Sequence, residues 1–263
     1  MVSVLGIPYD GNSSFMTGSA LAPTYIRQAF HSNSANYFSE SGVDLNNHPG
    51  WVDQGDLVFN TGNFADTILQ GITPLAAKGH QLLSLGGDHS VTFPIVEALH
   101  RAHGPMSILH LDAHSDLYQD FEGNPYSHAS PFARILERGL AKRLVQAGIR
   151  TLNTHQRAQA QRWGVEVIEM KNWSDLHRFS FEGPVYLSLD MDAIDPAFAP
   201  GVSHHEPGGF TSRQIIAILQ KLDAQLVGAD IVELNPQRDA SGITAMLAGK
   251  LFKELLDVML RTR

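Results

Sequence analysis

The sequence of 263 residues contains no cysteine. Disulfide bonds, thiolate metal ligands and a cysteine nucleophile are therefore excluded, and we expect a protein of the cytoplasm, where disulfides are rare. Long apolar runs are also missing. No segment reaches the roughly 20 apolar residues of a membrane span, and the N-terminus lacks the basic start and apolar run of a signal peptide. The sequence thus predicts a soluble, unprocessed chain that does not enter a membrane.

An excess of positive charge is absent as well. The 19 Lys and Arg residues are outnumbered by 27 Asp and Glu residues, so the formal net charge is −8. Such a balance gives no electrostatic basis for binding nucleic acid. Hydrophobic residues make up 43% and charged residues 17%, which is ordinary for a globular protein and excludes a disordered chain. We expect one domain over residues 1–263, because single α/β domains commonly reach this length.

Three clusters of acids and histidines each follow a short apolar run. They are residues 86–90 (GGDHS), 112–116 (DAHSD) and 190–195 (DMDAID), and the apolar runs before them cover 81–85, 107–111 and 184–189. Such runs predict buried strands of a parallel sheet, whose carboxyl ends form the edge where ligands bind. If the backbone stays extended past each strand, side chains two residues apart point the same way. Six potential metal ligands then converge: His89, Asp112, His114, Asp116, Asp190 and Asp192.

Strand and helix patterns alternate along the whole sequence. We expect further strands at 2–7, 144–149, 165–170 and 226–233, and helices at 64–78, 91–102, from 131, from 211 or 212 to 222, and at 243–260. Residues 31–50 are rich in Ser and Asn and predict an irregular connection. The alternation predicts a three-layer α/β/α fold, with a central parallel sheet covered by helices on both faces.

Any one of these acids or histidines, taken alone, is more readily explained as a loop residue or a helix cap. Their joint occurrence argues against that explanation, because four adjacent carboxylates (Asp112, Asp116, Asp190 and Asp192) repel one another unless cations hold them. Two divalent ions balance the four formal charges. Oxygen ligands with some imidazole and no thiolate suit manganese. We therefore predict two Mn²⁺ ions per subunit, with other divalent ions as alternatives, in a site that activates water for hydrolysis.

The motifs GGDHS, DAHSD and SLDMDAIDPAFAPG resemble the three signatures of the ureohydrolases, the arginase and agmatinase family, in order and spacing. The resemblance covers essentially the whole chain and implies an arginase-like fold and a homo-oligomer, trimeric or hexameric. It also implies a ligand assignment, in which Asp112 and Asp190 bridge the ions. His89 and Asp116 would complete one site, and His114 and Asp192 the other. Asp116 would also accept a hydrogen bond from the attacking hydroxide.

The same resemblance implies two further catalytic residues. Glu233 aligns with the acid that binds the guanidinium group, and His128 aligns with a loop histidine that passes a proton to the leaving amine. Taken alone, His128 would be interpreted as an ordinary loop residue. For Glu233 an ordinary loop acid is the alternative, and it is the less favoured one. Asp88 and His110 are expected to support the ligands, and Asp195 to orient its loop. His204 and His205 receive no role.

The resemblance implies a small cationic guanidino compound as the substrate, and the loops give mixed indications of which one. Tyr118 occupies the place where animal-type arginases have an asparagine, which favours agmatine. In contrast, residues 121–124, 203–209 and 235–239 resemble plant-type arginases. We predict hydrolysis of agmatine to putrescine and urea, with arginine as the alternative and guanidinobutyrate third. A catalytically silent metal-binding or polyamine-sensing protein is a hypothesis from another class. A zinc deacetylase on a related fold is a third, and the second pair of ligands argues against it.

Overall fold

The computed structural model describes residues 1–60 and 62–261 and contains an eight-stranded sheet in which the paired strands are parallel. The strand order is β2-β1-β3-β8-β7-β4-β5-β6. The strands are β1 (Val2–Gly6), β2 (Trp51–Asp56), β3 (Gln81–Leu85), β4 (Met106–Leu111), β5 (Ala141–Ile149), β6 (Glu166–Glu169), β7 (Ser180–Asp190) and β8 (Asp223–Val232).

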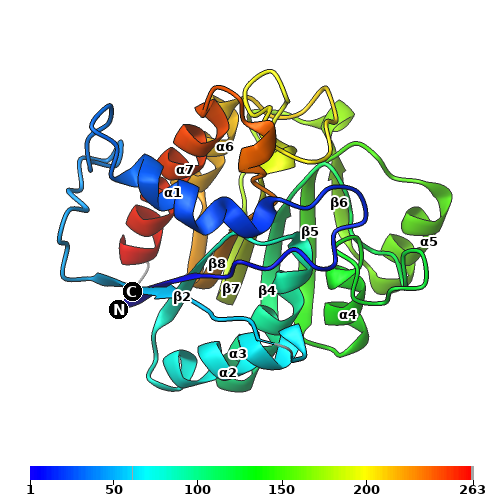
Figure 1. Ribbon diagram of the computed structural model, residues 1–263. Helices are drawn as coiled ribbons and strands as arrows, with labels where there is room; N and C mark the ends of the chain where they lie inside the picture. The colour runs from blue at the N-terminus through cyan, green and yellow to red at the C-terminus, as the bar shows by residue number, and fades with distance from the viewer. Residues whose placement is uncertain (61, 262–263) are drawn as a thin grey trace.

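Helices cover both faces of this sheet (Figure 1). The α-helices are α1 (Ala22–Phe30), α2 (Phe64–Ala77), α3 (Thr92–His103), α4 (Pro131–Glu137), α5 (Thr154–Trp163), α6 (Ser212–Lys221) and α7 (Ile243–Arg261). Helices α1, α6 and α7 pack on one face, and α2, α3 and α4 contribute to the core on the other. The predicted three-layer α/β/α fold is therefore confirmed. No helix in residues 1–60 and 62–261 is both long and apolar enough to cross a membrane.

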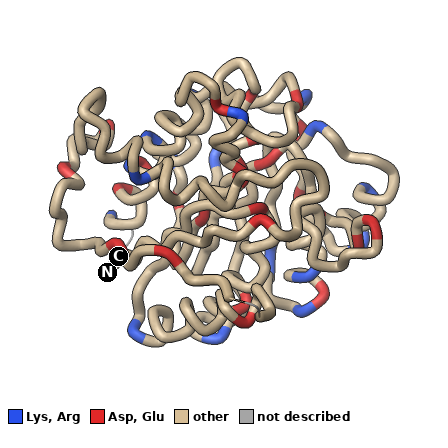
Figure 2. Tube along the Cα trace, in the orientation of Figure 1, with Lys and Arg blue, Asp and Glu red and all other residues tan. Residues whose placement is uncertain are grey.

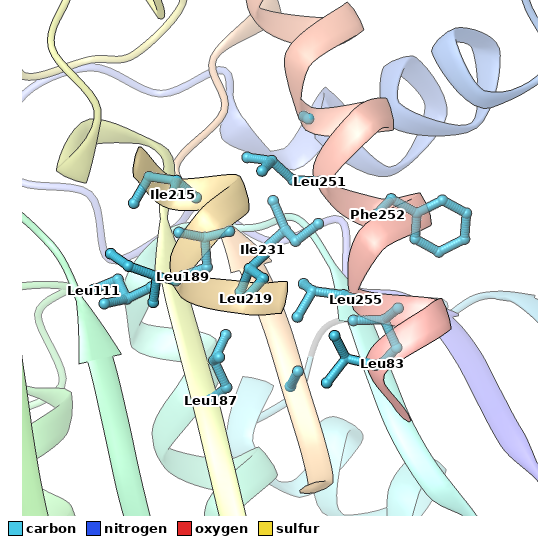
Figure 3. Packing of buried hydrophobic residues seen from close by; sticks show 14 of the residues in the cluster. Leu83, Leu111, Leu187, Leu189, Ile215, Leu219, Ile231, Leu251, Phe252 and Leu255 are labelled. Atoms are coloured by element: carbon cyan, nitrogen blue, oxygen red, sulfur yellow. The ribbon is translucent and has the colours of Figure 1, made fainter. Parts of the chain in front are cut away.

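Alternate side chains of the central strands enter two separate cores. In β7, Leu187 and Leu189 lie in the core under α6 and α7, whereas Tyr186 lies in the core on the opposite face. Figure 3 shows Leu187 and Leu189 beside Leu219 of α6, with Leu255 of α7 nearby. Because both faces are covered, the buried parts of these strands are predominantly apolar, which is why their sequences were recognisable.

Three elements were not predicted from the sequence. Strand β2 lies at the sheet edge with Val52 to Asp56 exposed, so its sequence has no apolar pattern. Helix α5 is strongly polar, and its clearest signal is a capping box between Asn153 and Gln156. Helix α1 begins with Pro23 in its first turn. The segment from 31 to 50 contains no helix or strand, as expected.

The strands that carry the predicted site residues lie next to one another in the middle of the sheet, in the order β3-β8-β7-β4. Leu85, Ile231, Leu189 and Leu111 pair across these four strands in one row. The residues that follow this row carry the predicted ligands and Glu233. Four carboxyl ends are thus brought together at one edge of the sheet.

Candidate active site

The loop after β3 turns sharply to place His89 at the strand end. Gly87 has a φ of +90°, and a Cβ atom there would lie 2.8 Å from the carbonyl oxygen of Tyr9 and 2.9 Å from that of Ile7. Only glycine fits this backbone and this close approach. Asp88 then caps a 3-10 helix, η2 (His89–Val91), by accepting a hydrogen bond from the backbone of Ser90. Asp88 therefore supports the ligand position, as expected from the sequence.

Three carboxylates surround one nitrogen of His89. Its Nδ1 atom lies 3.1 Å from Asp112 Oδ2, 3.0 Å from Asp116 Oδ2 and 3.1 Å from Asp190 Oδ2. This buried nitrogen makes no well-aligned hydrogen bond with any residue that the structure describes. Four donor atoms thus converge from three strand ends, which is the arrangement that a divalent cation requires.

A buried relay fixes the orientation of the His89 ring. Ser188 Oγ lies 2.9 Å from His89 Nε2 and donates a hydrogen bond of 2.8 Å to Asp230 Oδ1. Since the hydroxyl hydrogen of Ser188 is donated to Asp230, Ser188 Oγ accepts a hydrogen bond from the Nε2–H group of His89. The Nδ1 atom then keeps its lone pair toward the carboxylates, as a metal ligand must.

Asp230 is fully buried and is the end point of this relay. It also accepts hydrogen bonds of 2.6 Å from Thr92 Oγ1 and 2.6 Å from Tyr186 OH. Ser188 and Asp230 were not predicted as site residues. A polar residue inside an otherwise apolar buried strand is the sequence signal that could have identified both, because such groups are buried only when they have partners.

A second cluster lies beside the first and shares Asp112 with it. His114 Nδ1 is 3.4 Å from Asp112 Oδ1 and 3.1 Å from Asp192 Oδ2. The structure therefore brings together all six residues that the sequence singled out. Asp190 contacts the His89 cluster, and its bridging role toward the second cluster stays a prediction.

The convergence has a different cause from the one expected. The backbone does not stay extended after the strands, so the argument from alternating faces is wrong. Asp112 Oδ1 accepts a hydrogen bond of 2.6 Å from His114 N, and Asp190 Oδ1 accepts one of 2.7 Å from Asp192 N. These are turns closed by the aspartate side chain. Asp116 adopts a φ of +49°, unusual for a residue other than glycine, and residues 191–193 form a 3-10 helix, η4 (Met191–Ala193).

His110 supports Asp112 and is not a free ligand. The side-chain amide nitrogen of Gln146 donates to the Ser115 carbonyl at 2.6 Å, which fixes its orientation, and lies 3.0 Å from His110 Nδ1. His110 Nδ1 is therefore an acceptor, and Nε2–H donates a hydrogen bond of 2.6 Å to Asp112 Oδ2. The ring thus orients the carboxylate, in agreement with the supporting role that the sequence predicted.

The electrostatics of the two clusters favour bound cations. Burial, together with the charges of Asp192 and Asp112, raises the pKa of Asp190 well above its usual range. Figure 2 shows acidic positions near the centre of the molecule and most Lys and Arg positions around its outline. Among the described residues, no Lys or Arg side chain lines the cavity beside the two clusters, so divalent ions are the charges that match this donor set.

His128 and Glu233 form a buried pair next to the His89 cluster. His128 Nδ1 lies 2.8 Å from Glu233 Oε1, which also accepts a hydrogen bond of 2.9 Å from the backbone of His89. Burial lowers the pKa of His128, but the charge of Glu233 and the hydrogen bond to it outweigh burial and raise the pKa to about 9. Burial raises the pKa of Glu233, but His128 outweighs it and lowers that pKa. Both shifts favour an ion pair.

The remaining atoms of this pair are directed toward other groups. His128 Nε2 lies 2.8 Å from Ser14 Oγ and accepts a hydrogen bond of 3.2 Å from the backbone N–H of Ser14. The Oε2 atom of Glu233 makes no hydrogen bond to any residue that the structure describes. Glu233 also has a φ of +63°, so both Asp116 and Glu233 are held in an uncommon backbone conformation at the site.

A cavity of about 220 Å³ opens over both clusters. Among the described residues, its lining includes Asp116, His128 and Glu233, and also two residues without a predicted role, His204 and Glu206. The His204 ring packs 5.6 Å from the His114 ring and 5.4 Å from the His128 ring.

His205 does not line the cavity, and its Nε2 lies 2.7 Å from the Pro200 carbonyl oxygen. Asp195 accepts hydrogen bonds from the backbone of residues 197, 208 and 209, so it orients this loop as expected.

A second cavity of about 260 Å³ lies between α6 and residues 173–179 and is lined by Trp173 and Phe179. It contains none of the predicted site residues.

Comparisons with known proteins agree with this geometry. Residues 1–257 match the sequence model of the arginase family. The chain is 47% identical over 271 residues to Arginase 1, mitochondrial, of Arabidopsis thaliana, an alignment that covers 96% of the chain and 79% of the relative. The arginase structure from Medicago truncatula superposes with a TM-score of 0.92 at 44% identity, covering 98% and 87% of the two chains. A hypothetical agmatinase from Burkholderia thailandensis superposes with a TM-score of 0.87 at 30% identity, covering 99% and 86%.

Proposed function

Because this chain belongs to the arginase family, which is dependent on a binuclear metal centre and acts on guanidino compounds, we propose that it hydrolyses arginine to ornithine and urea. The observation that carries the proposal is that the sequence identity of this chain differs between two solved structures that it covers to a similar extent. Identity is 44% to the Medicago arginase and 30% to the hypothetical agmatinase. The agmatine preference drawn from Tyr118 is not confirmed, and the relatives support its alternative, arginine.

The proposed metal ligands follow the two clusters. His89, Asp112, Asp116 and Asp190 would hold one ion, and Asp112, His114, Asp190 and Asp192 the other. The residues fit this assignment, because His89 Nδ1 is buried without a hydrogen bond and faces three carboxylate oxygens. We assign Mn²⁺, two per subunit, on the oxygen-rich, thiolate-free donor set. When bound, such ions would lower the pKa of a water molecule so that hydroxide becomes available near neutral pH.

The chain's own residues would then bind and orient the reactants. Glu233 binds the guanidinium through Oε2, while its Oε1 is held by His89 N and His128 Nδ1. Asp116 lines the cavity and accepts a hydrogen bond from the attacking water. The carbon–nitrogen bond to the ornithine side breaks once the leaving nitrogen is protonated.

His128 is the proposed source of that proton. Its Nδ1–H is held by Glu233, and its Nε2 faces Ser14 at the cavity wall. In the structure His128 Nε2 accepts the backbone N–H of Ser14, so this nitrogen must first take up a proton, which it could then transfer to the leaving amine. The neighbouring charge of Glu233 raises the pKa of His128 and so favours the protonated ring.

The assembly and location are proposed from the family resemblance and composition: a trimer or hexamer in the cytoplasm. The name of the Arabidopsis relative places that protein in mitochondria and does not support the location proposed for this chain.

The test is urea release from purified, Mn²⁺-loaded protein supplied with arginine, agmatine or 4-guanidinobutyrate. We expect the highest kcat/KM for arginine. A higher kcat/KM for agmatine would contradict the proposal and support the prediction from Tyr118. An Asp116→Asn variant, assayed in parallel, should release no urea from any of the three; undiminished cellular function of that variant would favour a non-catalytic role.

A further inference from the structure

Glu206 is an acid at the cavity that the proposed reaction leaves without a role. Five carboxylates line the cavity: Asp116, Asp190, Asp192, Glu206 and Glu233. Three belong to the proposed metal sites and Glu233 takes the guanidinium. Glu206 therefore remains as a negative charge for another part of the substrate.

The formal charges at the cavity also favour a cationic group beside Glu206. The four ligand carboxylates balance two divalent ions, and Glu233 balances the guanidinium. Glu206 adds one further negative charge at the cavity, and its positive neighbour Arg150 lies outside the described lining, which contains no Lys or Arg side chain. An additional cation in the cavity is favourable under these conditions, whereas an additional anion without a cation is not.

Glu206 lies at the open end of the cavity. Its side chain is 41% exposed, whereas Glu233 is buried at the inner end. No hydrogen bond joins the Glu206 carboxylate to a described residue, and His114 Nε2 lies 3.9 Å from Glu206 Oε1. A substrate that places its guanidinium on Glu233 would extend its other end toward this free carboxylate.

Arg150 fixes the position of Glu206 relative to the metal ligands. Its Nε and Nη2 atoms donate to the Glu206 carbonyl oxygen at 2.9 and 2.6 Å, and Nη2 also donates to the Asp192 carbonyl oxygen at 2.7 Å. The guanidinium of Arg150 thus joins the loop that carries Glu206 to the turn that carries Asp192. The backbone of Glu206 is therefore held at a defined place beside the second cluster, and its carboxylate extends from there into the cavity lining.

We propose, resting on the proposed function, that Glu206 binds the ammonium group at the far end of the substrate. The enzyme would then select guanidines with a second, distal positive charge over guanidines that lack one. Arginine and agmatine have such a group. A guanidino acid without an amine does not.

Two matched substrate pairs test this role. Arginine is compared with 5-guanidinopentanoate, which lacks only the α-amino group, and agmatine with pentylguanidine, in which a methyl group replaces the ammonium. Glu206→Gln should lower kcat/KM about fivefold to tenfold for arginine and agmatine, mainly through KM, because a half-exposed ion pair is lost. Values for the two analogues should stay within about twofold, which also shows that the variant is folded. Glu122→Gln, on an exposed loop acid outside the lining, is the control and should change none of the four values.

Two outcomes would overturn the inference. An equal fall for all four compounds, or loss of one Mn²⁺ per subunit, would mean that Glu206 acts through His114 and not on the substrate. If the wild-type protein releases urea from no guanidine, the proposed function fails by itself. In that case, calorimetry with agmatine and pentylguanidine still decides the role of Glu206, because only agmatine should bind more weakly to Glu206→Gln.

Discussion

The backbone N–H of His89 donates a hydrogen bond of 2.9 Å to Glu233 Oε1. This contact joins a proposed metal ligand from the end of β3 to the proposed guanidinium partner from the end of β8. The two strands are neighbours in the sheet, and Glu233 N in turn donates to the Gly87 carbonyl oxygen at 3.0 Å. The proposed metal centre and the proposed substrate-binding acid are therefore fixed relative to each other by contacts of the main chain, which would limit the positions that the reacting carbon can take.

Glu233→Gln should lower kcat/KM for arginine by about 30-fold or more, because a charged hydrogen bond to the guanidinium is worth about 2 kcal/mol or more in a buried site. Steady-state urea release measures the effect. Glu137→Gln, on an exposed part of α4, is the matched control and should retain full activity. An unchanged kcat/KM in Glu233→Gln would show that Glu233 does not bind the guanidinium group.

Ser188→Ala should weaken one of the two metal sites about 10- to 100-fold, because His89 loses the partner that fixes its tautomer. Titration of metal-free protein with Mn²⁺, followed by calorimetry, measures this change, and activity should return at high Mn²⁺ concentration. Ser84→Ala is the control: Ser84 pairs in register with Asp230, as Ser188 does, yet its hydroxyl has no hydrogen-bond partner among the described residues. Equal metal affinity in the two variants would contradict the relay.

The ion pair of His128 with Glu233 should make stability depend on pH. The pKa of His128 is raised to about 9 from a usual value near 6.5, so the folded state holds the proton more tightly than the unfolded state. The stabilisation is fully present below about pH 6.5 and is lost as the pH rises through about 9. Relative to His128→Gln, metal-free wild-type protein should lose up to about 3 kcal/mol of unfolding free energy across this window.

Urea denaturation at several pH values gives the comparison for His128. The same measurements on Glu233→Gln should show a much smaller pH dependence, since Glu233 is the main cause that raises the pKa. A difference between wild type and His128→Gln that is constant with pH would show that the pair is not ionised.

Removal of metal should destabilise the protein. Without cations, Asp190 and its neighbours bury carboxylates that repel one another, and ions that bind only the folded state stabilise it by mass action. At a Mn²⁺ concentration of about 100 times Kd, this amounts to about 2.7 kcal/mol per site. Thermal denaturation with EDTA and with increasing Mn²⁺ measures the effect, and a Tm independent of Mn²⁺ would contradict the proposed ligands. Because the ligands must be deprotonated, the stabilisation should also decrease as the pH falls.

A helix or strand could be predicted from the sequence where its own residues show a clear apolar pattern. Strands β3 and β4 and the second half of β7 were recognised because both of their faces are buried, which makes them predominantly apolar. In contrast, β2 at the sheet edge and the polar helix α5 bury little apolar surface, so periodicity could not reveal them. For the same reason the candidate ligands were found: acids directly after a buried strand stand out from the apolar residues before them.

The sequence by itself therefore determined the fold class, the six candidate ligands and the kind of reaction that the resemblance implies. Only the tertiary structure decided how these side chains converge, that Ser188 and Asp230 orient His89, and that Glu206 reaches the cavity. The physical reason is that these contacts join residues far apart in the chain. They depend on the order in which β3, β8, β7 and β4 pair and on turns closed by aspartate side chains, and neither is encoded in the spacing of apolar residues.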